Sequence, residues 1–280
     1  MSDLLTDFME GVYPSKWMRR LGKIPDPWQE EVLDSSSRFI ALNCCRQAGK
    51  TDVVAFLAGH EAAYKPDSLI LATAPAERQS KILFARTRAV VEKAGVTMTA
   101  ASKTHMEFDN GSEIYALPGK DGTIRGYSPK LVIIDEASRA ADELYYAVRP
   151  MMAMNDGRMV LLSTPWGKRG FYHEVWMGGA PEQTWHAPWK EGAPEDDWHR
   201  ISVNAREHPR YPQEFVDSEQ AVLPDWIFKQ EYMCEFAETQ DAVFAYNDIE
   251  AMFLDDVEGM PDAGDADVDF DNQVEAYEFD

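Results

Sequence analysis

Two short stretches of this chain place reactive side chains directly after apolar runs. The first, residues 43–51, is the loop Asn-Cys-Cys-Arg-Gln-Ala-Gly-Lys-Thr, which follows an apolar run at 39–42 and precedes another that begins at Val53. A buried strand, a tight loop ending in Gly-Lys-Thr and a helix form the setting of a phosphate-binding loop. The backbone N–H groups of such a loop attract an anion, Lys50 reaches the β- and γ-phosphates, and the Thr51 hydroxyl takes one position on Mg²⁺.

The loop departs from the usual spacing at one position. A glycine normally stands five residues before the second glycine of the motif, but Cys44 occupies that place here. By itself, Gly49-Lys50-Thr51 is therefore equally compatible with a lysine in an ordinary helix-start turn. The apolar runs on either side favour the phosphate-binding alternative, and a second stretch favours it more strongly.

That second stretch ends in an acidic pair. Residues 131–134 are Leu-Val-Ile-Ile, and Asp135 and Glu136 follow. Four aliphatic residues in a row predict a buried central strand of a parallel sheet, and open α/β sheets bind ligands beyond the carboxyl ends of their strands. We expect Asp135 to hold the Mg²⁺ shell, directly or through water, and Glu136 to polarise the attacking water. The alternative is a strand that ends in two solvated acids.

Three further sites have side chains suited to this chemistry. Gln29 lies in the first turn of a helix that begins after Pro27. Its amide either pairs with adenine, to which it offers both a donor and an acceptor, or has no role beyond the start of the helix. Arg125 lies on the loop that leads to the acidic strand, and it is either an arginine finger or an arginine satisfied by nearby carbonyl groups. Ser163 and Thr164 end an apolar strand, where their hydroxyls would hydrogen-bond the water at the γ-phosphate and sense hydrolysis.

The composition predicts a globular cytosolic protein. The chain has 280 residues, 45% of them hydrophobic, which allows one large or two modest domains with a sizeable core. No apolar run approaches the ~20 residues of a membrane span, and the acidic N-terminus lacks the basic start of a signal peptide. Three cysteines without metal-ligand spacing predict a reducing cytosol and no structural zinc.

The negative charge is concentrated at the C-terminus. The net charge is −22, and residues 255–280 contain eleven acidic residues and no Lys or Arg, so half of it lies there. We expect residues 246–280 to form an acidic, disordered tail, because the segment repels itself and has few apolar groups to bury. It either solvates the protein or, through its aromatic residues, docks to a partner or mimics DNA. The acidic balance disfavours diffuse nucleic-acid binding but allows a local basic channel.

Hydrophobic periodicity predicts alternating helices and strands without internal repeats. We expect residues 190–212, which contain several prolines, to be irregular and residues 190–240 to form a helical lid region. The other expected helices lie at 4–21 (interrupted at Pro14), 52–64, 77–94, 141–153, 171–176, 213–223 and 227–233. The expected strands lie at 39–42, 68–74, 131–134, 158–163 and, at the sheet edge, 185–189, with a hairpin or meander in 96–117 that turns at 109–111.

These motifs and their order resemble those of the ATPase domain of the large terminase subunit of tailed bacteriophages, the DNA-packaging motor. The resemblance covers about residues 20–245. That family commonly lacks the first loop glycine and carries Arg-Gln in the loop, so Cys44 fits its pattern. The resemblance rests on Trp28-Gln29, residues 45–51, Ala74-Pro75 with Gln79, Ile124-Arg125-Gly126, residues 131–137, Leu162-Ser163-Thr164-Pro165 and residues 230–236.

The resemblance implies a fold and an activity. The fold is α/β: a RecA-like P-loop NTPase of the additional-strand, catalytic-glutamate class, with a mostly parallel sheet flanked by helices, in a domain of residues 1–245. The activity is Mg²⁺-dependent ATP hydrolysis that drives double-stranded DNA into a procapsid. The implied partners are DNA, the portal protein, the small terminase subunit and further copies of the chain in a ring, in the host cytoplasm and without a membrane.

The resemblance also assigns residues by matched position. Arg125 matches the arginine that reaches a neighbouring subunit's nucleotide, and Arg46 is the competing candidate, acting within its own subunit. The implied catalytic residues are Glu136, Lys50, Arg125 and Arg46. The implied nucleotide contacts are Gln29 at the adenine, Arg46, Gln47, Ala48, Gly49, Lys50, Thr51, Asp135, Ser163 and Thr164, with Thr51 and Asp135 at the metal.

One departure from the family and two alternatives remain. Such proteins usually continue into an RNase H-like nuclease domain, but we find no strand with a metal-binding aspartate after residue 245, so nuclease activity is not expected from this chain. Either a separate polypeptide carries the nuclease, or this sequence is the ATPase part alone. A superfamily 2 helicase or translocase shares the Gly-Lys-Thr and Asp-Glu-Ala patterns but needs a second RecA-like domain. A non-hydrolysing nucleotide-binding scaffold with an acidic docking tail is disfavoured by the presence of Lys50 and Glu136.

Overall fold

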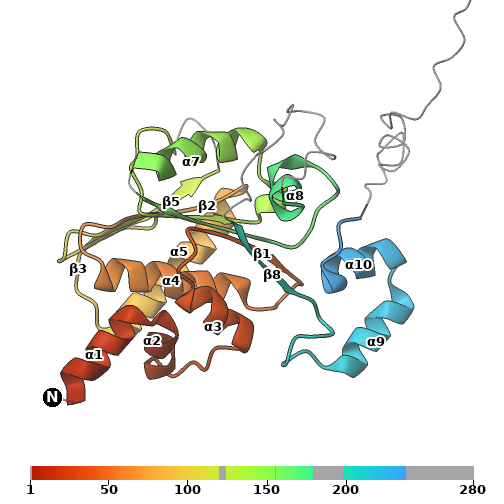
Figure 1. The fold of residues 1–280 in the computed structure, drawn as a ribbon, viewed down its shortest axis with the longest axis horizontal. Coiled ribbons are helices and arrows are strands. Elements are labelled where there is room, and N and C mark those ends of the chain that lie inside the picture. Colours follow the sequence, from red (N-terminus) through yellow and green to blue (C-terminus); the bar gives the residue numbers. More distant parts are fainter. Residues whose placement is uncertain (1, 120–123, 155, 179–197, 238–280) are drawn as a thin grey trace, which may run out of the picture. The chain divides into compact units, whose positions relative to one another are not determined.

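The computed structural model describes residues 2–119, 124–154, 156–178 and 198–237, which form an eight-stranded sheet with helices on both faces (Figure 1). The strand order is β3-β4-β5-β2-β6-β7-β1-β8. The strands are β1 (Phe39–Cys44), β2 (Leu69–Ala74), β3 (Met98–Ala101), β4 (His105–Phe108), β5 (Glu113–Pro118), β6 (Leu131–Asp135), β7 (Arg158–Ser163) and β8 (Trp198–Val203). The helices are α1 (Ser2–Val12), α2 (Pro14–Arg20), α3 (Pro27–Asp34), α4 (Lys50–Tyr64), α5 (Glu77–Ala94), η1 (Ala137–Arg139), α7 (Asp142–Met154), α8 (Gly170–Trp176), α9 (Gln213–Val222) and α10 (Asp225–Met233).

The centre of the sheet is parallel. Strands β5, β2, β6, β7, β1 and β8, in this spatial order, pair in parallel with one another, whereas β4 pairs antiparallel with β5 and β3 pairs antiparallel with β4. Every residue of β1 and β6 is buried, as expected for parallel strands that are covered on both faces. Strand β7 lies between β1 and β6, so the loops after these three strands emerge at one edge of the sheet.

The two faces of the sheet carry separate hydrophobic cores. On one face, α7 and α8 cover the sheet, and α4 and α5 cover the other (Figure 1). Residues along almost the whole length of α4 are buried, because the N-terminal helices pack against its outer side. Trp17 of α2 makes edge-on contacts with the rings of Phe56, His60 and Tyr64 of α4.

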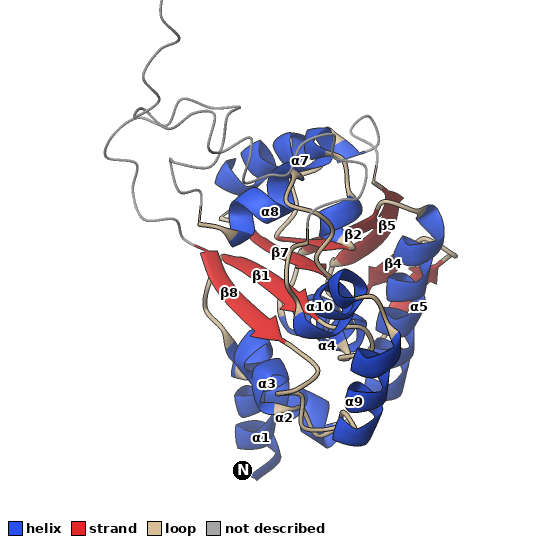
Figure 2. Cartoon of the chain, turned by 90° about the vertical axis from the view of Figure 1, so that its right-hand side faces the viewer, coloured by secondary structure: helices blue, strands red, loops and turns tan. Residues whose placement is uncertain are grey.

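Helices α9 and α10 follow β8 and return the chain to the loop after β1 (Figure 2). Within α10, the ring of Phe228 stacks on that of Tyr232. The Tyr232 hydroxyl donates a hydrogen bond to Glu219 of α9, and this bond joins the two helices. The amide of Arg46 donates to the carbonyl of Glu231 at 3.1 Å. The C-terminal helices therefore contact the first candidate stretch of the sequence directly.

Most predicted elements are confirmed. The helix break at Pro14, the parallel strands, the hairpin turn before Gly111 and the two C-terminal helices all lie where the periodicity placed them. The predicted mostly parallel sheet flanked by helices is also confirmed. The predicted edge strand at 185–189 and the predicted acidic tail lie outside the described residues.

One expectation was wrong. Residues 198–203 were expected to be irregular and part of a helical region, but they form β8, which pairs in parallel with β1 at the edge of the sheet. Only Ile201 and Val203 of this strand are buried, because an edge strand contacts the core along part of its length. The segment therefore lacks the apolar run that marks the central strands.

None of the helices in the described ranges is long and apolar enough to cross a membrane.

Two buried histidines make the fold sensitive to acid. Burial lowers the pKa of His60 in α4 and of His173 in α8, each to about 4. The Nε2–H of His60 donates to the carbonyl oxygen of Glu10 at 2.8 Å, which sets the tautomer of the neutral ring. In the unfolded chain both rings take up a proton near pH 6.5. The unfolded state therefore binds more protons between pH 6.5 and 4, and the free energy of unfolding falls as the pH decreases through that window.

We predict that His60→Gln reduces this loss of stability. The wild type should lose on the order of 2–3 kcal/mol per buried histidine between pH 7 and pH 4, and the variant should lose correspondingly less. Urea unfolding at pH 7, 6, 5 and 4 measures the difference. Equal pH dependence in the two proteins would contradict the role of His60.

Candidate functional site

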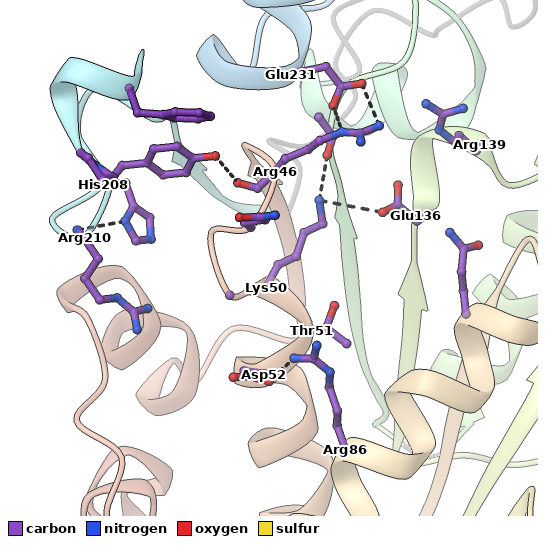
Figure 3. A pocket seen from close by; sticks show the side chains of 17 residues that line it. Arg46, Lys50, Thr51, Asp52, Arg86, Glu136, Arg139, His208, Arg210 and Glu231 are labelled. Atoms are coloured by element: carbon purple, nitrogen blue, oxygen red, sulfur yellow. Dashed lines mark hydrogen bonds and ion pairs between the residues drawn. The ribbon is translucent and has the colours of Figure 1, made fainter. Parts of the chain in front are cut away.

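A cavity of about 1080 Å³ opens where the loops after β1, β6 and β7 meet (Figure 3). Its wall includes the 46–52 loop, α5, the turn after β6, the start of the loop after β7, and residues of the 208–215 and α10 segments. The parallel strands thus deliver residues from distant parts of the sequence to one place, as expected for an open α/β sheet.

The loop after β1 turns sharply into α4. Gln47 and Gly49 have φ values of 56° and 92°, which lie in the left-handed region. Gly49 is the N-cap of α4, and a Cβ atom there would lie only 3.0 Å from the amide nitrogen of Gln29. The backbone conformation therefore favours glycine at this position, and a side chain there would also press on the Gln29 amide. The first-turn N–H groups of a helix have no intrahelical acceptor, so this end of α4 favours an anion.

Lys50 is the central cation of the cavity. Its side chain is nearly buried, and its Nζ donates a 2.7 Å hydrogen bond to Oγ1 of Thr164. The same Nζ lies 3.9 Å from Oε1 of Glu136 (Figure 3). Residues that follow three different strands therefore converge on one ammonium group.

The acidic pair after β6 divides into a buried and a cavity-facing carboxylate. Oδ1 of Asp135 accepts the N–H of Glu136 at 2.9 Å, and burial, aided by the charge of Glu136, raises the pKa of Asp135 to about 6. Glu136 has a φ of 52°, a left-handed conformation that costs a non-glycine residue on the order of 1 kcal/mol. This backbone turns the carboxylate of Glu136 into the cavity.

Oxygen groups near Lys50 suit a hard cation. Thr51 lines the cavity with a hydroxyl, and Asp135 supplies a buried carboxylate beside Glu136. Mg²⁺ prefers oxygen ligands of these kinds. The donor set therefore fits the predicted metal.

Hydroxyl groups connect the ends of β6 and β7. Oγ of Ser138 lies 2.6 Å from Oγ of Ser163 and donates to the carbonyl of Thr164 at 2.8 Å. Because Thr164 also accepts from Lys50, the network joins the acidic turn to the phosphate-binding loop.

The segment after β8 encloses the loop from outside. Arg46 forms an ion pair with Glu231 of α10, and its carbonyl accepts from the hydroxyl of Tyr211 at 3.2 Å. The ring of His208 donates from Nε2 to the carbonyl of Ala48 at 3.1 Å. The conformation of the loop is therefore set by long-range contacts as well as by its glycine.

The structure brings most of the predicted residues to one cavity. Three of the others, Ala48, Asp135 and Ser163, are buried among its supporting residues, and Arg125 is exposed and is not part of its wall. The predicted residues that line the cavity are Arg46, Gln47, Gly49, Lys50, Thr51, Glu136 and Thr164.

Gln29 has the helix-start role that the sequence analysis left as the alternative to an adenine contact, together with a contact to Gly49 that the sequence did not indicate. It is 2% exposed and is not part of the cavity wall. Its Oε1 accepts the N–H of Asp26 at 3.0 Å, completing a capping box, and its Nε2 donates to the carbonyl of Gly49 at 3.5 Å. Its adenine contact stays a prediction, while its contacts in this structure support the phosphate-binding loop.

Ten of the residues that line the cavity are not among the predicted site residues, and four of them contact the loop or follow the acidic pair: Arg139, His208, Tyr211 and Glu231. Arg139 lies three residues after Glu136, so its closeness to the acidic pair was the one available signal. The others lie more than 150 residues from the loop that they contact, and no local pattern indicates such a contact.

The chain matches a known family over most of its length. Residues 42–251 match the family model described as terminase large subunit, T4likevirus-type, N-terminal. Among curated proteins, the chain is similar to the large terminase subunit of Thermus virus P23-45, with 25% identity over 265 residues that cover 85% of this chain and 54% of that protein. The chain thus spans about half the length of the curated relatives it matches.

Solved structures show the same fold. The large terminase ATPase domain of Thermus phage P74-26 superposes with a TM-score of 0.67 at 23% identity, covering 81% of this chain and 100% of that one. The large terminase of another thermophilic bacteriophage, solved in complex with ADP, gives a TM-score of 0.59 at 10% identity, covering 81% and 53%. The predicted RecA-like P-loop fold is therefore confirmed.

We predict that Gln29→Ala weakens the binding of different nucleotides by the same factor. Loss of the capping box should lower the free energy of unfolding by about 1 kcal/mol, and a looser Gly49 turn should reduce the affinity for ATPγS and GTPγS by the same factor. Chemical denaturation and titration calorimetry with both analogues measure these effects. A loss confined to ATPγS would show instead that Gln29 reads the adenine.

Proposed function

This chain belongs to the terminase large subunit family of the T4likevirus type, and we propose that it is an ATP-hydrolysing motor subunit that packages viral double-stranded DNA into a procapsid. Its proposed partners are DNA, the portal protein, the small terminase subunit and neighbouring copies of the chain in a ring, in the host cytoplasm. The ADP complex of the thermophilic bacteriophage's large terminase supports a nucleotide as the ligand of the fold.

The observation that carries the proposal is the placement of Lys50. A nearly buried ammonium at the start of a helix, beside a left-handed glycine turn, is suited to phosphate oxygens. Its two present partners, Thr164 and Glu136, are groups that a bound phosphate would displace or share. The cavity therefore combines an anion-binding turn with a carboxylate placed for proton transfer.

Binding would place the triphosphate along the turn before α4. The loop N–H groups and Lys50 hold the β- and γ-phosphates, and Thr51 and Asp135, the latter directly or through water, would hold Mg²⁺. The metal ion, when bound, neutralises charge on the phosphate oxygens. Gln29, Gln47, Ala48 and Gly49 shape the rest of the nucleotide site, with Gln29 at the adenine or behind the turn.

Glu136 is the proposed general base. It orients a water molecule for in-line attack on the γ-phosphorus and accepts its proton. The new P–O bond forms as the bond from the γ-phosphorus to the bridging oxygen breaks, and the electron pair leaves with ADP. The strained backbone of Glu136 keeps its carboxylate in the cavity before the substrate arrives, which reduces reorganisation during the reaction.

Ser163 and Thr164 are the proposed sensors of hydrolysis. Thr164 shares Lys50 with the phosphates, and Ser163 is joined to the acidic turn through Ser138. Loss of the γ-phosphate would change the partners of Lys50 and so the hydroxyl network. Movement at this point is what a motor needs in order to couple hydrolysis to translocation.

Two arginines are proposed to assist in different ways. Arg46 lines the cavity and acts within its own subunit, where it is now paired with Glu231. Arg125 is exposed outside the cavity wall, which suits a residue that reaches the nucleotide of a neighbouring subunit. An arginine finger of this kind contributes on the order of 10³–10⁵ in rate.

We predict that Glu136→Gln retains ATP binding and loses turnover. Removal of the general base should lower kcat by at least about 100-fold while the affinity for ATPγS stays within about twofold. A phosphate-release assay and titration calorimetry measure the two quantities. Glu143→Gln, which changes an exposed glutamate of α7 outside the cavity, is the matched control and should behave as wild type. Unchanged turnover in Glu136→Gln would remove Glu136 from the mechanism.

We predict that the Arg125→Ala variant loses ATP turnover and regains it when it is mixed with a variant that carries a different defect. In a mixture with Glu136→Gln subunits, an Arg125→Ala subunit keeps its own base and receives Arg125 from its neighbour, so activity should reappear. Turnover per subunit of the wild type should also rise with protein concentration. Both are measured as phosphate release, with and without double-stranded DNA. Mixtures that stay as inactive as their components would place the arginine function within one subunit, where Arg46 is the candidate.

A further inference from the structure

The cationic side chains of the cavity are not equally available to a ligand. Five of them line it, and four have a carboxylate partner in the structure. The pairs are Arg46–Glu231, Lys50–Glu136, Arg86–Asp52 and Arg210–Asp26. The fifth cation, Arg139, has no hydrogen-bonded or ion-paired side-chain partner among the described residues.

Arg139 is nevertheless held in place. Its guanidinium carbon lies 3.7 Å from the centre of the Trp166 ring, a cation–π contact. Its backbone N–H donates to the carbonyl oxygen of Glu136 at 2.9 Å, closing the short helical turn η1 after β6. Stacking covers one face of the guanidinium plane and leaves its in-plane N–H donors for an acceptor. Arg139 therefore combines a fixed position with unused hydrogen-bonding capacity.

Arg139 is close in sequence to Glu136, and its ring partner Trp166 is close in sequence to Thr164. It lies one turn after Glu136, and Trp166 follows two residues after Thr164. The cation–π contact therefore bridges the turn after β6 and the loop after β7 outside the hydroxyl network of Ser138. The side chains of Arg139 and Glu136 both line the cavity (Figure 3).

We propose that Arg139 is a further catalytic residue, which binds the γ-phosphate of the nucleotide held in its own subunit. This inference rests on the proposed function. An unpaired guanidinium gains a charge-assisted hydrogen bond from phosphate without first breaking an ion pair. Arg46 and Arg86, in contrast, already share their charge and some of their N–H donors with a carboxylate. Arg139 thus discriminates a nucleotide with a γ-phosphate from ADP.

The test compares two nucleotides on two arginine variants. Arg139→Gln removes the charge at an exposed position, and Arg149→Gln is the matched control, since Arg149 is an exposed arginine stacked on the ring of Phe39 outside the cavity. Titration calorimetry with Mg²⁺ and ATPγS should show about tenfold weaker binding for Arg139→Gln, as expected for loss of one charged hydrogen bond. Its affinity for ADP should stay within about twofold of wild type, and Arg149→Gln should match wild type for both nucleotides.

Two further variants distinguish the charge of Arg139 from the effect of the Trp166 ring that holds it in place. Arg139→Lys keeps a cation and should recover part of the ATPγS affinity. Trp166→Leu keeps Arg139 but removes the ring that holds it, and should give an intermediate loss confined to ATPγS. Melting temperatures check that each variant is folded.

Two outcomes would overturn the assignment of Arg139. They are a loss of affinity for ADP as large as that for ATPγS, and no loss of affinity for either nucleotide. Turnover in the wild type, abolished by Glu136→Gln, would show in these cases that the proposed function stands without Arg139. A wild-type chain that binds neither nucleotide would overturn both the proposed function and this inference.

Discussion

The contact between the ammonium of Lys50 and the hydroxyl of Thr164 is the interaction on which the rest of the site depends. A cation that is almost fully buried needs polar partners, because desolvation without compensation is costly. Thr164 and Glu136 supply those partners only if β7 lies between β1 and β6 and all three strands run in parallel. The order of the strands is therefore a requirement of the site as well as of the core.

The surroundings of Lys50 are built to stay in position. The left-handed backbones of Gly49 and Glu136 aim the helix end and the carboxylate at the same cavity. The Ser138 network ties the acidic turn to the end of β7. Fixed dipoles and charges of this kind act on a transition state without reorganising. The local strain is tolerated because neighbouring strands and helices over-determine the backbone.

The sequence predicted the parts of the site that are local and missed the parts that are not. The phosphate-binding loop and the acidic pair each combine an apolar strand with adjacent polar residues, so a short window contains the whole signal. Strand β8, which pairs with β1 at the edge of the sheet, has only two buried residues. Its sequence therefore contains no apolar run that would predict a strand. The ion pair between Arg46 and Glu231 joins residues 185 apart in the chain. Contacts of this length follow from packing of the complete fold, which single-sequence patterns do not encode.

Charge pairing explains how an acidic protein holds a polyanion. The chain has a net charge of −22, so its overall field opposes a phosphate ligand, and attraction must come from the cavity itself. Within that cavity the carboxylates of Glu231 and Glu136 already occupy Arg46 and Lys50. A bound triphosphate would exchange these internal pairs for phosphate contacts, so its binding would be coupled to α10 and to the turn after β6. A cation without such a partner, as Arg139 is among the described residues, would contribute its full attraction to the ligand.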